Sequence, residues 1–64
     1  MKIFLNDQSR EVAAGDIAAL VAELGFTKGT VLVERNGTAL RHDEWTQPLA
    51  PDDRIELLRI VAGG

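Results

Sequence analysis

Apolar and polar residues alternate with a period of two at the start of the chain, which predicts a strand with one buried face. The first such stretch is KIFLN at 2–6, where Ile3 and Leu5 share one side. Turn-forming residues follow at 6–9. The stretch REVA at 10–13 then reads as a short return strand, so the sequence predicts an N-terminal hairpin.

The period changes to three or four residues between 17 and 24, which predicts a helix with one apolar face. Asp16 precedes this stretch as a suitable N-cap, and Gly25 follows it where a left-handed C-terminal residue is expected. A helix of about two and a half turns is not stable alone, so we expect it to lie on a sheet. The apolar face consists of Ile17, Leu20, Val21 and Leu24.

Strand-like patterns return in the second half of the chain. TVLVER at 30–35 is rich in β-branched residues, and the dipeptide NG at 36–37 predicts a tight hairpin into TAL at 38–40. RHDEWTQ, at 41–47, is polar around one tryptophan and predicts a short helical turn with that side chain in the core. The last strand is RIELLRIVA at 54–62.

This order of elements predicts an α+β protein with the β-grasp layout: a mixed sheet of about five strands (ββαββ with a final central strand) and one main helix packed on one face. The last strand then lies beside the first and runs parallel to it. A chain of 64 residues is one domain at most, so we expect a single domain over 1–64. The predicted core consists of Ile3, Leu5, Val12, Ile17, Leu20, Val21, Leu24, Val31, Val33, Leu40, Ile55 and Leu57.

Several apolar residues are out of phase with this core. Phe4 alternates with Ile3 and Leu5, and other large apolar residues alternate with the core positions of the third and last strands. We expect them to lie together on the open sheet face as a partner-docking surface, because an exposed apolar cluster on a small protein is a common interaction site. The predicted docking residues are Phe4, Leu32, Leu58 and Ile60.

Charge and composition exclude several classes of function. The formal net charge is −3 with both signs mixed along the chain, so no basic stripe suggests nucleic-acid binding. The chain has no apolar run long enough for a membrane span, and a cytoplasmic protein that is a monomer when free is the expectation. There is no cysteine, hence no disulfide, thiolate zinc site or cysteine nucleophile.

The remaining polar residues suggest no intrinsic catalytic or metal site. His42 has no second histidine and no placed nucleophile, and we interpret it as a surface residue. The carboxylates at 43, 44, 52 and 53 are interpreted as turn and cap residues. Arg35, Arg41 and Arg59 are interpreted as solvated charges in preference to members of a basic docking face.

The chain given ends in RIVAGG, an apolar strand followed by two glycines. Together with the strand order, the NDQ turn, NG at 36–37, EW at 44–45 and DRIELLRIVAGG at 53–64, this terminus resembles the ubiquitin-like sulfur carriers of bacteria. Within that family the whole chain is most similar to the ThiS branch, which serves the thiazole ring of thiamine. The approach to the glycines contains no proline, unlike many of the molybdopterin branch.

The resemblance implies a protein cosubstrate and no enzyme. Its C-terminal carboxylate, on Gly64, is expected to be adenylated with ATP by an E1-like (ThiF-type) enzyme and converted to a thiocarboxylate by a cysteine desulfurase or other persulfide donor. A ThiG-type thiazole synthase then takes the sulfur. Ala62 and Gly63 complete a flexible tail over 62–64, and no cofactor is expected to be bound.

Three alternatives stay open on the sequence alone. The small subunit of molybdopterin synthase shares the fold and the Gly-Gly terminus. A ubiquitin-like protein modifier shares the adenylation step and differs in joining Gly64 to lysines of other proteins. An interaction domain with an idle tail is the third reading.

Overall fold

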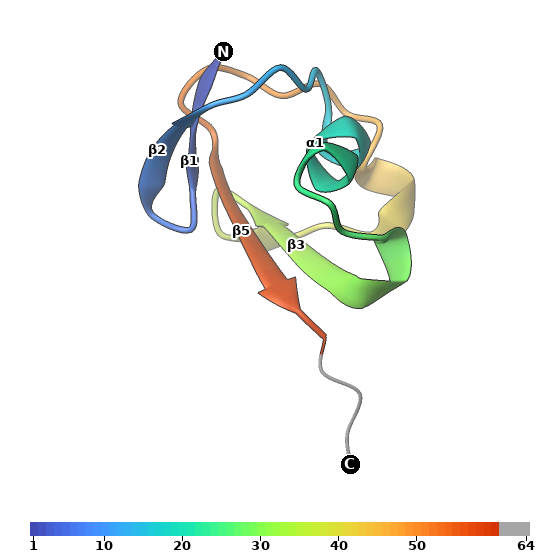
Figure 1. The fold of residues 1–64 in the computed structure, drawn as a ribbon. Coiled ribbons are helices and arrows are strands. Elements are labelled where there is room, and N and C mark those ends of the chain that lie inside the picture. The colour runs from blue at the N-terminus through green and yellow to red at the C-terminus, as the bar shows by residue number, and fades with distance from the viewer. Residues whose placement is uncertain (61–64) are drawn as a thin grey trace.

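A computed structural model describes residues 1–60 of the chain. Within these residues the chain forms five strands, one α-helix and two 3₁₀ turns (Figure 1). The elements are β1 (Lys2–Leu5), β2 (Gln8–Glu11), α1 (Ile17–Glu23), η1 (Lys28–Thr30), β3 (Val31–Arg35), β4 (Thr38–Ala39), η2 (His42–Glu44) and β5 (Arg54–Arg59).

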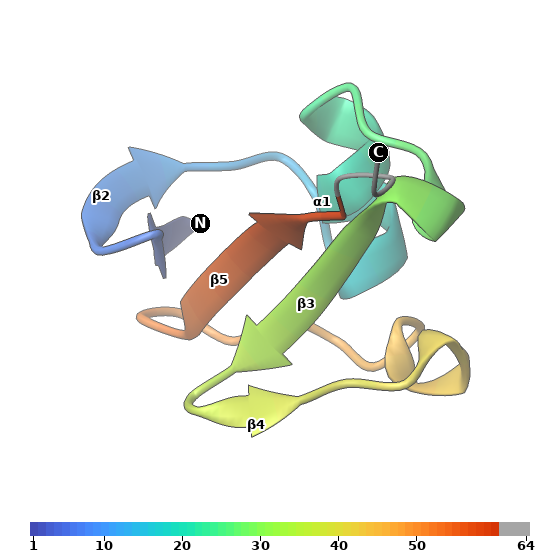
Figure 2. The same ribbon diagram turned by 90° about the horizontal axis from the view of Figure 1, so that it is seen from below.

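The five strands form one mixed sheet in the order β2-β1-β5-β3-β4. The last strand, β5, lies in the middle, parallel to β1 and antiparallel to β3. Figure 2 shows β3 and β5 side by side with α1 behind them. The sheet has α1 on one face, so the predicted β-grasp fold is confirmed.

Both hairpin turns use residues with positive φ, which two-residue turns of type I′ require. The predicted NG turn is confirmed, with φ of 51° at Asn36 and 86° at Gly37. In the first hairpin the turn is only Asn6 and Asp7, with φ of 48° and 67°. The return strand therefore begins at Gln8, earlier than predicted, because two left-handed residues reverse the chain without a longer loop.

The helix has the predicted ends. The N–H of Ala19 donates to Asp16 Oδ1 at 2.8 Å, which caps the N-terminus. Gly25 follows the helix with φ of 85°, a conformation that glycine adopts without steric cost. The apolar face of α1 is buried at Ile17, Leu20 and Val21.

The core agrees with the predicted set. Eight of its twelve members are buried, and Leu5, Leu24, Leu40 and Leu57 are partly buried against them. Trp45, at 2% exposure, is in the core as expected, and its carbonyl accepts a hydrogen bond from Ala18 N (2.9 Å), which ties the end of η2 to α1. The sequence analysis missed Ala14, Phe26 and Leu49.

The turn η1 was also not predicted. It forms because the Thr30 N–H and hydroxyl both donate to the carbonyl of Thr27, at 3.1 and 2.8 Å. This pair of hydrogen bonds places Val31 at the start of β3, with its side chain buried.

Candidate functional site

The site implied by the sequence is the end of β5 and the open face of the sheet around it. Ile60 follows β5, and its N–H donates to the carbonyl of Thr30 at 2.8 Å. One residue earlier, the guanidinium of Arg59 lies 5.4 Å from the centre of the Phe26 ring on the helix side. The chain is therefore anchored up to Ile60. The proposed carrier residue Gly64 and its neighbours Ala62 and Gly63 lie outside the described residues.

Three of the four predicted docking residues meet on the open face. Leu32 lies directly opposite Leu58 in the antiparallel register of β3 and β5, and Ile60 follows two residues later. Their exposed fractions are 56%, 46% and 47%, high for large apolar side chains. Leu32, Leu58 and Ile60 form what we call the open-face patch. It adjoins the point where the chain continues towards the two glycines.

The fourth predicted docking residue does not join this patch. Phe4 pairs with Arg54 at the beginning of β5, four residues before Leu58, or about 13 Å along the strand. It is half-buried, with Lys2 Nζ 4.8 Å and the Arg54 guanidinium 5.9 Å from its ring centre. The expectation that Phe4 lies together with Leu58 and Ile60 is wrong, because β1 pairs only with the first two residues of β5.

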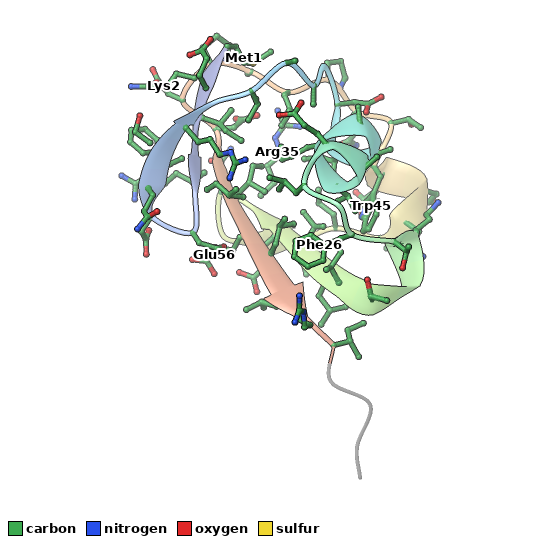
Figure 3. The ribbon with its side chains drawn as sticks, viewed as in Figure 1. Met1, Lys2, Phe26, Arg35, Trp45 and Glu56 are labelled. Carbon is green, nitrogen blue, oxygen red and sulfur yellow. The ribbon has the colours of Figure 1, made fainter. Side chains whose placement is uncertain are left out.

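The arginines considered for the docking face do not lie on it. Arg35 points to the helix side (Figure 3), where its Nη2 lies 2.7 Å from Asp53 Oδ2. Arg41 is exposed at η2 and donates from Nε to Asp43 Oδ1 at 3.1 Å. This hydrogen bond raises the pKa of Arg41 and lowers the pKa of Asp43. The interpretation as a solvated charge is confirmed for Arg41, but it is wrong for Arg35, whose side chain is 21% exposed and paired with the buried carboxylate of Asp53.

A buried carboxylate was missed by the sequence analysis. Asp53, only 7% exposed, accepts hydrogen bonds from Ala50 N at 2.8 Å and Asn36 Nδ2 at 3.2 Å in addition to its ion pair with Arg35. Asn36 in turn accepts from Arg54 N through Oδ1 at 2.9 Å. This cluster joins the β3–β4 turn to the start of β5. The contact with Ala50 is local, but the contacts with Arg35 and Asn36 join residues 17 or 18 positions apart, so no local pattern signals the burial of Asp53.

The described residues contain no candidate metal centre. Within 1–60, no group of three histidine, cysteine, aspartate or glutamate side chains is arranged to hold an ion. His42 is exposed, as expected, and its ring lies edge-on to Trp45 with 4.9 Å between centroids. None of the described helices is long and apolar enough to cross a membrane.

The geometry alone does not identify the family of the chain, but comparison with known protein families does. The model of the ThiS family matches residues 3–64, which is nearly the whole chain and includes both terminal glycines. The chain belongs to the ThiS family. We therefore interpret the strand order, with β5 in the centre and the chain continuing from its end, as that of a ThiS-family protein.

Solved structures support the same fold. The chain is similar to a crystal structure of the thiamine biosynthesis protein ThiS from Geobacter metallireducens, with a TM-score of 0.80, 23% identity and full coverage of both chains. A solution NMR structure of a thiamine biosynthesis protein from the same organism matches with a TM-score of 0.80 and 23% identity, over all of this chain and 88% of the other.

A different kind of likeness involves a much larger protein. The chain is 42% identical over 55 residues to the alpha subunit of ATP-dependent 6-phosphofructokinase from Saccharomyces cerevisiae. The match covers 81% of this chain but only 6% of that subunit. It concerns a short segment of the yeast protein.

Proposed function

We propose that this ThiS-family chain is a sulfur carrier for the thiazole ring of thiamine, and that its sulfur is held on the carboxyl group of Gly64. The single observation that supports this most is the family match over residues 3–64, which includes Gly63 and Gly64. The same match favours the thiamine branch over the molybdopterin branch.

The chemistry proposed for the carboxylate begins with activation, because a carboxylate is a poor electrophile. Its oxygen attacks the α-phosphorus of ATP on an E1-like enzyme, which releases pyrophosphate and leaves an acyl-adenylate. The terminal sulfur of a protein persulfide then attacks the carbonyl carbon, and AMP leaves. A second thiol cleaves the resulting S–S bond, which gives the thiocarboxylate and a disulfide on the donor side.

Glycine at both final positions suits this chemistry. An adenylating enzyme has to admit the end of the chain into a narrow site, and glycine brings no side chain into it. A Cβ on the last residue would crowd the carbon that the persulfide attacks. The absence of cysteine from the sequence also means that no thiol of the carrier competes for the acyl group.

The open-face patch is the proposed contact for the partners. Leu32, Leu58 and Ile60 are exposed beside the exit of the chain, so an enzyme that covers them also receives the residues that follow. The partners of this proposal are a ThiF-type adenylating enzyme, a cysteine desulfurase or other persulfide donor, and a ThiG-type thiazole synthase. ATP is a substrate of the activating enzyme and is not bound by the carrier alone.

The test is reconstitution followed by intact-mass spectrometry. A chain ending at Gly64 is incubated with the adenylating enzyme, ATP and the persulfide donor. We expect a product in which one C-terminal oxygen is replaced by sulfur. Deleting Gly64 should abolish it, as should adding one residue, which displaces the reacting carbon by about 3.3–3.6 Å. Equal reaction of the extended chain, without trimming, contradicts the proposal, and adducts to lysines of other proteins would indicate a modifier instead.

A further inference from the structure

Beyond the open-face patch, the same face of the sheet carries an acidic half. Glu34 and Glu56 lie directly opposite each other in the register of β3 and β5. Both alternate with buried residues, so both side chains are on the open face, and Figure 3 shows Glu56 on the side of β5 away from α1. Like charges directly opposite in an antiparallel pair are destabilising, because their Cβ atoms are only roughly 4.5–5.5 Å apart.

These two glutamates line a hollow of about 380 Å³. Asp7, from the turn between β1 and β2, contributes a third carboxylate to its wall. Arg54 is the cation of the lining, and its guanidinium lies over the Phe4 ring. Within residues 1–60, the ion pairs involve neither glutamate nor Asp7. The hollow is therefore net negative.

We propose that this hollow receives an arginine or lysine side chain of the adenylating enzyme, while the open-face patch contacts an apolar surface of the same enzyme. The inference rests on the proposed function and names the chemistry of its partner. A guanidinium placed between Glu34 and Glu56 turns their repulsion into charge-assisted hydrogen bonds. An apolar or acidic group would instead have to desolvate two carboxylates without compensation.

The two halves of the face also set an orientation. Glu56 lies on β5 and Ile60 directly follows that strand, four residues later, which separates the acidic hollow from the tail end of the patch by about 13 Å. A partner that matches its basic side chain to the hollow and its apolar surface to the patch can bind in one direction only. Charge complementarity thereby selects the arrangement in which the residues after Ile60 enter the enzyme.

The experiment compares single-charge variants in binding to the adenylating enzyme. We expect Glu34→Gln and Glu56→Gln each to raise the Kd by about tenfold at low salt, with the difference shrinking as salt is added. Their stability against urea should be equal to or higher than that of the native chain, because the cross-strand repulsion is relieved. Asp43→Asn is the matched control: it removes one exposed charge from η2, on the helix side of the sheet, and should leave the Kd unchanged.

An unchanged Kd in both glutamine variants overturns the inference. An equal loss of affinity in Asp43→Asn also overturns it, because the effect would then reflect net charge alone. Weaker binding with a matching loss of stability also overturns it. Thiocarboxylation of the native chain distinguishes a failure of this inference from a failure of the proposed function. If the native chain gains sulfur while the glutamine variants bind normally, only the inference fails. If the native chain neither binds nor gains sulfur, the proposed function fails and the inference fails with it.

Discussion

Replacing Asp53 with asparagine should remove much of the free energy of unfolding. The carboxylate is almost fully buried and faces three donors: Arg35 Nη2 at 2.7 Å, Ala50 N at 2.8 Å and Asn36 Nδ2 at 3.2 Å. Asparagine has the same shape but offers one oxygen and an NH₂ group, which would point at a donor. Arg35 would also lose its counter-charge.

The structure sets the size of the effect. Removing one partner of a fully buried ion pair costs about 3–5 kcal/mol. The Arg35 side chain is 21% exposed and regains some water, so we expect about 2–4 kcal/mol. A domain of this size has only ~3–5 kcal/mol in total, so the Asp53→Asn variant should be close to unfolded in buffer.

Tryptophan fluorescence during urea unfolding measures this directly. Trp45 is the chain's sole tryptophan, there is no tyrosine, and the ring is buried in the core. With a slope near 1 kcal/mol per molar urea, the midpoint should fall by about 2 M or more. Asp52→Asn is the matched control: its carboxylate is exposed and paired with Lys2 Nζ at 3.0 Å, and its loss should cost about 1 kcal/mol or less.

The reasoning is refuted if Asp53→Asn shifts the midpoint no more than Asp52→Asn does. A second variant separates lost packing from an unpaired charge. Adding Arg35→Met to Asp53→Asn should recover part of the stability, because it removes the guanidinium left without its partner.

Three further predictions concern the core, the open face and an exposed ion pair. Leu20→Ala should cost about 2–5 kcal/mol in the same urea assay, and an unchanged midpoint would place Leu20 outside the core. Leu58→Asp should keep the native midpoint but weaken binding to the adenylating enzyme, since a charge would have to be desolvated; unfolding of this variant would mean that Leu58 is a core residue. The Arg41 hydrogen bond lowers the pKa of Asp43 from 3.8, so its stabilisation is complete above that value and is lost as pH falls through the lowered folded-state pKa. Asp43→Asn should slightly flatten the pH dependence of the midpoint below about pH 4, and an unchanged profile would contradict this.

The elements that were predicted correctly carry short-range signals. The Asp16 cap, the NG turn and the helical spacing of Leu20 each depend on residues within a few positions. The central place of β5 followed from the element order, since the last strand had only the first strand left as an unpaired neighbour in the middle of the sheet.

The features that were missed depend on long-range partners. The position of Phe4 is set by how far β1 extends along β5, which is fixed by contacts such as Leu57 N to Asn6 Oδ1 at 2.9 Å, across 51 positions in sequence. Alternation shows which face a residue occupies but not where its neighbour strand begins. For the same reason the sequence indicated only that Asp53 is a turn residue, because its burial depends on Arg35 and Asn36 in the β3–β4 hairpin.

The most direct test of the central claim follows sulfur from the carrier into product. The chain is loaded with isotope-labelled sulfur at Gly64, separated from the persulfide donor, and mixed with the thiazole synthase and its other substrates. The account predicts labelled thiazole and return of the chain to its carboxylate mass, with one sulfur transferred per chain consumed. Thiazole that forms without the label, while the chain keeps its sulfur, would contradict the claim that this protein is the sulfur carrier.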